Sequence, residues 1–152
     1  LKEAHLRAAI DLVREGRWDV GTCATPLNTD IARTDASVVK VARAASGRAL
    51  YFSRAPIPYK RDEKPIGEEL EREPFLRHIG IYSYTRAALH DWVALAPSQL
   101  ERLELLEQLR PLEAGLKIGV AIVGAVDPGV DTPADVIRIE EKLSEQGATT
   151  FA

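Results

Sequence analysis

The chain has 152 residues, of which 45% are hydrophobic and 28% charged, and its formal net charge is −3 at pH 7. This length and composition exclude wholesale disorder and predict a single domain over residues 1–152. The slightly acidic charge gives no overall field for nucleic acid, and no apolar run reaches the ~20 residues of a membrane helix, so we expect neither nucleic acid nor a membrane as partner.

In the first half of the chain, one amphipathic helix precedes several short extended segments. Apolar residues at steps of three and four predict a helix over residues 1–15, which Gly16 ends. The residues at 44–48 predict a hairpin loop, and the proline-rich stretch 56–74 predicts a surface loop or lid. Three runs rich in β-favouring residues predict strands at 19–24, 38–42 and 49–53.

The second half continues the alternation of strands and helices. Alternating side chains predict a strand at 77–84. Ser98 is a suitable N-cap for a helix that we expect to run from residue 99 to about residue 113. Three further elements are expected, namely a helix at 86–95, a strand at 117–123 and a helix at 134–146. Together these elements predict an α/β fold with a mixed β-sheet flanked by helices.

Arg54 directly follows the strand predicted at 49–53 and precedes the rigid turn of Pro56 and Pro58. Open α/β sheets bind ligands at the ends of their strands, and a guanidinium group suits a carboxylate or a phosphate. The same position is also typical of a surface arginine beside an ordinary loop. The spacing alone leaves both interpretations open.

His78, Gly80 and Tyr82 lie on one face of the strand predicted at 77–84, because side chains alternate along a strand. Gly80 would leave space between the two rings, in which a small polar ligand could lie. The alternative is a histidine and a tyrosine that simply pack on a half-buried sheet face.

Further polar side chains occur in the helix predicted at 99–113 and after the last strand. Glu104 and Gln108 are one helical turn apart, with Glu107 beside them, so they form either a solvated face or a surface for a polyhydroxylated ligand. Asp131 stands before a predicted helix, where it either supports the N-cap or ligates Mg²⁺. The single cysteine, Cys23, excludes an internal disulfide and a cysteine-based metal site, and it fits a cytoplasmic protein.

Five blocks of sequence carry more information together than these residues do singly. In chain order they are VVKV, GRALYFSRAPIPY, RHIGIYSYTRAAL, PSQLERLELLEQLRPLEAG and PGVDTPADV, and they span residues 38 to 136. The stretch WDVGTCATPL precedes them and also fits. In these blocks the chain resembles the C-terminal part of the 3-deoxy-manno-octulosonate cytidylyltransferases, also called CMP-Kdo synthetases.

The resemblance implies a nucleotide-diphospho-sugar transferase-like (Rossmann-like) fold and a Mg²⁺-dependent reaction of CTP with the eight-carbon sugar acid Kdo. It further implies a cytoplasmic homodimer that serves lipopolysaccharide biosynthesis. Carried over by motif, Arg54 would hold the sugar carboxylate, and Asp131 would bind the metal ion. His78, Tyr82, Glu107 and Gln108 would contact the rest of the sugar.

The chain has no methionine and begins with Leu1, which leads us to expect a piece of a longer protein. Compared with the family, the phosphate-binding loop of the N-terminal nucleotide-binding part and a second metal-binding aspartate are absent from it. We therefore expect the whole protein to be a nucleotidyltransferase, and the chain to be its sugar-binding and dimerisation portion, inactive alone. Two alternatives stay open: an enzyme for amino-Kdo or sialic acid, and a non-catalytic binding or dimerisation fragment.

Overall fold

The computed structural model describes residues 2–27, 33–59, 61, 75–124 and 140. The predicted helix at 134–146, apart from residue 140, lies outside the described residues, as do Asp131 and most of the stretch 56–74. No helix in the described part is long and apolar enough to cross a membrane. The elements are α1 (Glu3–Arg14), β1 (Val20–Pro26), β2 (Lys40–Arg43), β3 (Ala49–Ser53), β4 (Leu76–Tyr84), α3 (Arg86–Ala94), α4 (Gln99–Glu104), α5 (Leu109–Glu113) and β5 (Ile118–Ile122).

The five strands form one sheet in the order β3-β2-β4-β1-β5. β1 pairs in parallel with β5, whereas the pairs β1–β4, β2–β3 and β2–β4 are antiparallel. The hairpin between β2 and β3 turns at Gly47, whose φ of 94° favours glycine. The predicted mixed sheet and its hairpin are therefore confirmed.

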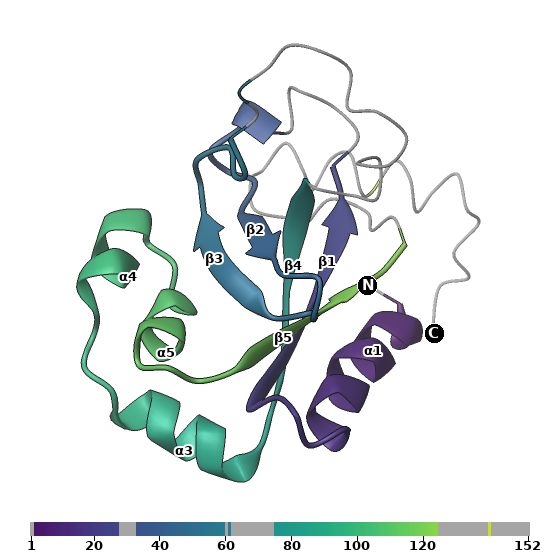
Figure 1. Cartoon of the computed structure of the whole chain (residues 1–152), viewed down its shortest axis with the longest axis vertical. Coiled ribbons are helices and arrows are strands. Elements are labelled where there is room, and N and C mark those ends of the chain that lie inside the picture. Colours follow the sequence, from purple (N-terminus) through teal and green to yellow (C-terminus); the bar gives the residue numbers. More distant parts are fainter. Residues whose placement is uncertain (1, 28–32, 60, 62–74, 125–139, 141–152) are drawn as a thin grey trace.

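Helices cover both faces of this sheet (Figure 1). On one face, Trp92 of α3 and Leu109 of α5 share the larger core with Val20 of β1. On the other face, Ala9 of α1 packs against Cys23 of β1 in a smaller cluster. The two residues of β1 serve different clusters because they are three positions apart and side chains alternate along a strand. The fold is thus a sheet between two helical layers.

The single helix predicted from residue 99 to about residue 113 is wrong, because the chain forms α4 and α5 with a break between them. Leu105 at the break has a φ of 52°, which is the left-handed region. Pro111 explains why one helix cannot continue: it lacks an amide hydrogen, and its ring would clash with the carbonyl group four residues earlier. In the observed structure Pro111 falls in the first turn of α5, where a proline is tolerated.

The left-handed residue gives a stability prediction with an internal control. Leu105→Gly should raise the free energy of unfolding by about 0.5–1 kcal/mol, because glycine adopts positive φ without steric cost. Leu103→Gly, inside α4, should lower it by about 1 kcal/mol. The two leucines are 74% and 73% exposed in the single chain, so any packing lost is similar in the two variants and their difference reports the backbone conformation. Urea unfolding of both variants checks the signs, and two losses of equal size would contradict the assignment of strain to Leu105.

Candidate functional site

The end of the sheet where β3 stops and β4 begins gathers several of the predicted site residues. Lys40 of β2 pairs with Ser53 of β3 on one side and with Arg77 of β4 on the other. Arg54 and His78 directly follow these two partners. The main-chain N–H of His78 also donates to the carbonyl of Val39 at 2.9 Å. The register therefore places Arg54 and His78 in one row across the sheet, although they are far apart in sequence.

The guanidinium group of Arg54 is held by main-chain carbonyl groups. Its Nε donates to Glu104 at 2.8 Å, its Nη1 to Ala36 at 3.0 Å, and its Nη2 to Leu105 at 3.4 Å. A guanidinium has five N–H groups, so these bonds leave one on each Nη atom. Those two N–H groups suffice for a two-pronged contact with a carboxylate.

Glu104 is the side chain that joins α4 to the end of β3. Its carboxylate accepts hydrogen bonds from the hydroxyl of Ser53 at 2.7 Å and from the main-chain N–H of Arg54 at 2.9 Å. The same carboxylate raises the pKa of Tyr51 in addition to the larger effect of burial. Helical periodicity had suggested only a shared face for Glu104 and Gln108, and that interpretation is wrong because the helix ends between them.

Lys40 is a buried cation beside Arg54. It is 0% exposed, and its ammonium group donates to the carbonyl groups of Asp35 at 2.8 Å, of Val38 at 2.5 Å and of Arg54. Burial lowers the pKa of Lys40, and the nearby charge of Asp35 opposes that shift. Lys40 therefore ties the segment before β2 to the residue that follows β3. No sequence pattern marks Lys40 for such a role, because lysine is seldom fully buried.

Thr22 determines which ring nitrogen of His78 carries the hydrogen. The threonine hydroxyl donates its one hydrogen to the carbonyl group of Ile81 at 2.6 Å, so its oxygen accepts the N–H of His78 Nε2 at 2.9 Å. The neutral ring then carries its hydrogen on Nε2 and leaves Nδ1 as an acceptor. Burial lowers the pKa of His78 to about 4, and at neutral pH the ring is uncharged.

This low pKa predicts a loss of stability in mild acid. An unfolded histidine takes up its proton near pH 6.5, whereas folded His78 resists it until about pH 4. The full contribution is present above pH 6.5 and is lost as pH falls toward 4, in total about 3 kcal/mol. Urea unfolding at several pH values in this window should show a weaker pH dependence for His78→Gln. His90→Gln, at an exposed position, is the control, and equal slopes in all three proteins would contradict the prediction.

The rings of His78 and Tyr82 are close together, which confirms that they share a face of β4. Their centroids are 5.3 Å apart. Phe52 lies against His78 at 5.0 Å, and Trp92 lies against Tyr82 at 5.7 Å. The predicted space for a ligand between the two rings is wrong, because they contact each other. Any ligand must lie beside this aromatic row rather than within it.

Gly80 shows why the predicted space does not exist. Its φ is 72°, and the pairing of β4 with β1 shifts register between Thr22 and Ala24, opposite this segment. The glycine is exposed, and a Cβ atom added to it would meet nothing within 4 Å. The strand bulges outward at Gly80, and the bulge brings the rings on either side together.

The hydroxyl group of Tyr82 is buried and has no hydrogen-bond partner among the described residues. Burial raises the pKa of Tyr82, and the negative charge of Glu107 adds to this effect. Tyr84, stacked on Tyr82 at 6.0 Å, has a raised pKa for the same two reasons. Glu107 is exposed and Gln108 is 2% exposed. The site thus offers protonated phenol groups near one carboxylate.

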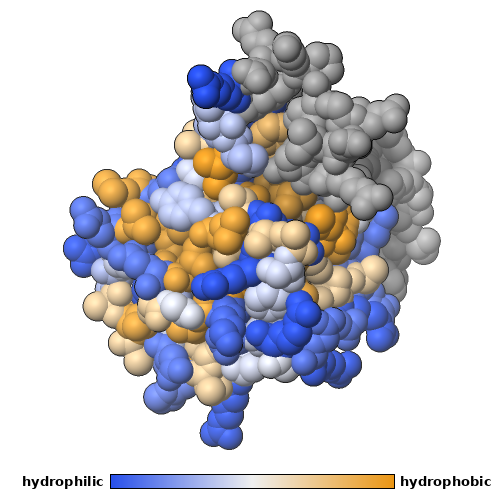
Figure 2. Space-filling model, viewed as in Figure 1, coloured by the Kyte–Doolittle hydropathy of each residue, from blue (hydrophilic) through white to orange (hydrophobic). Residues whose placement is uncertain are grey.

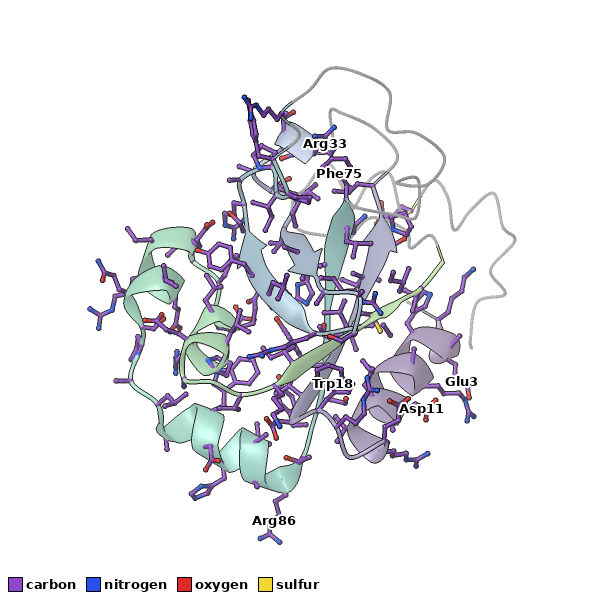
Figure 3. The ribbon with its side chains drawn as sticks, viewed as in Figure 1. Glu3, Asp11, Trp18, Arg33, Phe75 and Arg86 are labelled. Carbon is purple, nitrogen blue, oxygen red and sulfur yellow. The ribbon has the colours of Figure 1, made fainter. Side chains whose placement is uncertain are left out.

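A third cation, after Arg54 and Lys40, lies at this end of the sheet, and no sequence pattern marks it. The guanidinium carbon of Arg33 is 3.7 Å from the ring centroid of Phe75, the residue before β4. Figure 3 shows Arg33 and Phe75 together at this end, with Trp18 toward the opposite end. Arg33 lies between the strands predicted at 19–24 and 38–42, where no periodicity marks an individual residue.

The described residues do not by themselves form a magnesium site. Among them, no group of three or more histidine, cysteine, aspartate or glutamate side chains is arranged to hold a metal ion. Asp131, the carboxylate that the resemblance assigns to the metal, lies outside the described residues.

Comparison with known proteins identifies relatives of this arrangement. A family model described as cytidylyltransferase matches residues 1–118. The 3-deoxy-manno-octulosonate cytidylyltransferase of Xanthomonas euvesicatoria pv. vesicatoria is 42% identical over 146 residues, which cover 93% of the chain and 56% of that protein. The protein of the same description from Gemmatimonas aurantiaca is 46% identical over 135 residues, covering 88% of the chain and 50% of that protein.

A solved structure agrees with these sequence relatives. It is a CMP:2-keto-3-deoxy-manno-octonic acid synthetase complexed with CTP, and it matches 96% of the chain and 58% of its own length with a TM-score of 0.84 and 33% identity. The chain therefore spans about half the length of the curated relatives it matches. The resemblance noted in the five sequence blocks is confirmed, and the chain belongs to the cytidylyltransferase family.

Proposed function

We propose that the chain is the sugar-acid-binding part of an enzyme that forms CMP-Kdo from CTP and 3-deoxy-D-manno-octulosonate. In this reaction the anomeric hydroxyl oxygen of the sugar attacks the α-phosphorus of CTP. A new C–O–P linkage forms between the sugar and the α-phosphorus. The bond from the α-phosphorus to the oxygen that bridges it to the β-phosphorus breaks, and pyrophosphate and the hydroxyl proton leave. CMP-Kdo is the activated sugar that lipopolysaccharide synthesis needs.

The observation that carries this proposal is that Arg54 and His78 lie in one row at the same end of the sheet. Arg54 has two N–H groups that its carbonyl partners leave over, which suits a sugar carboxylate. His78 is neutral, so Arg54 rather than His78 supplies the positive charge for the carboxylate. The Nδ1 atom of His78 can accept a hydrogen bond that a sugar hydroxyl donates. The names of the relatives and of the CTP complex support CTP and Kdo as substrates.

The remaining proposed contacts follow from the protonation states of the side chains. Tyr82 keeps its proton, and its buried hydroxyl without a described partner can donate to a sugar oxygen. Glu107 can accept hydrogen bonds from sugar hydroxyls, and the amide group of Gln108 can both donate and accept. This mixture of one cation with neutral and acceptor groups suits a polyhydroxylated acid.

The proposal includes Mg²⁺, held by Asp131. A metal ion neutralises phosphate charge and aligns the reacting groups, and Mg²⁺ prefers one or two carboxylates together with substrate phosphates. The support is the GVDT block and the chemistry of the reaction, since the described residues contain no group of three or more side chains arranged to hold a metal ion. This chain's own described groups bind and orient the sugar acid.

The proposal also includes a cytoplasmic homodimer. Leu50, Leu103 and Leu105 are exposed by 57%, 73% and 74%. Figure 2 shows hydrophobic atoms gathered on the face that carries β3 and α4. Exposed apolar side chains grouped in this way are typical of protein–protein contacts and support association of two copies.

The substrate is tested with the complete gene product that contains these residues. The protein is incubated with CTP, Mg²⁺ and, separately, Kdo, amino-Kdo or sialic acid, and each product is identified by mass spectrometry. The expected result is CMP-Kdo formed faster than either other CMP-sugar. A dominant CMP-sialic acid or CMP-amino-Kdo product would reassign the substrate, and no product with any acid would indicate a non-catalytic role.

A further inference from the structure

We propose that Glu104 is a positioning residue that orients Arg54 for the carboxylate of the sugar acid. The inference rests on the proposed function of Arg54. Glu104 ends α4 and lies 50 positions from Arg54 in sequence. None of the comparisons assigns it a role.

Glu104 holds the end of β3 by side chain and main chain together. One carboxylate oxygen accepts from Ser53 and the other from the main-chain N–H of Arg54, while the Glu104 carbonyl accepts from the Arg54 Nε. The hydroxyl of Ser53 accepts in turn from the N–H of Ala55 at 3.0 Å. Three consecutive residues are therefore fixed through a single glutamate.

The turn after α4 directs a second acceptor to the same arginine. The left-handed conformation of Leu105, with a φ of 52°, breaks the helix immediately after Glu104. The carbonyl group of Leu105 then accepts from Nη2 of Arg54 at 3.4 Å. A left-handed backbone is unfavourable for leucine. Here it accompanies the approach of the carbonyl groups of Glu104 and Leu105 to the guanidinium group of Arg54.

The negative charge of Glu104 also acts on the cations beside it. Lys40, whose ammonium group donates to the carbonyl of Arg54, lies close enough to the Arg54 guanidinium for the two cations to repel. The Glu104 carboxylate acts on Lys40 in the opposite direction and favours its charged form. It thus offsets the repulsion at the point where the anionic substrate would bind.

An arginine fixed in this way binds a carboxylate at a lower entropic cost. A free arginine loses side-chain freedom when it binds, whereas Arg54 is ordered beforehand by its three carbonyl partners. Its two remaining N–H groups, one on each Nη atom, then have a set direction. Removal of Glu104 should therefore weaken sugar-acid binding without touching the nucleotide.

Glu101 provides a matched control on the same helix. Its carboxylate accepts from Nε of Arg110 at 2.7 Å and from the main-chain N–H of Ser98 at 3.1 Å, so it caps α4 and joins it to α5. Within the described part of the chain, its side chain bonds to Ser98 and Arg110 and not to β3. A general loss of helix stability should therefore follow from Glu101→Gln as well, whereas misplacement of Arg54 should follow only from changes at Glu104.

The test measures steady-state kinetics of the complete gene product with CTP and Kdo. Glu104→Ala should raise the KM for Kdo by about 10- to 100-fold and change the KM for CTP by less than about twofold. Glu104→Gln should keep the KM for Kdo within about threefold, because its amide oxygen can accept from Arg54 and its NH₂ can donate to Ser53. Thermal melts confirm that each variant is folded.

The outcomes separate this inference from the proposed function. If the unchanged protein forms no CMP-Kdo, the proposed function fails. If it is active and the KM for Kdo is the same in Glu104→Ala, or rises equally in Glu101→Gln, the positioning role is overturned. If Glu104→Ala does not fold, Ser53→Ala replaces it; a rise of about threefold or more in the KM for Kdo supports the role, and an unchanged value overturns it.

Discussion

Replacement of Arg54 by alanine should raise the KM for the sugar acid by about 10- to 100-fold in the complete gene product, while the KM for CTP stays within about twofold. The reason is the loss of a charge-assisted, two-pronged contact, which contributes roughly 1.5–3 kcal/mol. Steady-state kinetics with one substrate varied at a time separates the two constants.

Two variants show whether this effect comes from the site or from the fold. Arg54 also donates to three carbonyl groups, so Arg54→Ala should lower stability as well, and urea unfolding measures that part. Arg54→Lys keeps the charge but lacks the planar fork, and it should restore only a fraction of the binding. Arg102→Ala, an exposed arginine on α4, is the control. Unchanged kinetics in Arg54→Ala would remove Arg54 from the site.

Asp131→Asn should lower kcat on the order of 100-fold or more while the protein remains folded. The proposed loss is one negative charge that holds Mg²⁺, which is worth several kcal/mol in a reaction that concentrates charge on phosphates. A Mg²⁺ titration of activity should show a strongly raised requirement in the variant.

The alternative role of Asp131 gives a different result. In the sequence Asp-Thr-Pro it could serve a helix N-terminus, and its loss would then cost about 0.5–2 kcal/mol of stability. A lowered melting temperature with an ordinary Mg²⁺ dependence would therefore contradict the metal assignment. Asp135→Asn, four residues later in the same block, is a matched control for a change of charge.

The fold was predictable wherever local patterns decide the structure. The strand at 49–53 has the same bounds in the structure, and α1 and α3 agree with their predictions to within about two residues. The helix expected over 99–113 failed because apolar periodicity was given more weight than Pro111, which cannot occupy the interior of a continuous helix. The space predicted between His78 and Tyr82 failed for a related reason. Strict alternation assumes a regular strand and takes no account of the positive φ and the bulge at Gly80.

The candidate site was predictable in part. Arg54 could be selected because it follows the end of a predicted strand, where such sheets bind ligands. His78 could be selected because strand alternation places it on one face with Tyr82. The partners that fix them could not be selected. Thr22 lies 56 positions from His78, and Glu104 lies 50 positions from Arg54. Contacts of that separation depend on the order of the strands in the sheet, which no local pattern reveals.

A crystal structure of the complete gene product with Kdo bound shows whether Arg54 holds the sugar acid. We expect the sugar carboxylate within hydrogen-bond distance of both Nη atoms of Arg54, with Glu104 still bound to Ser53 and a sugar hydroxyl at Nδ1 of His78. Kdo bound at another place, with Arg54 contacting only its three carbonyl groups, would contradict this expectation.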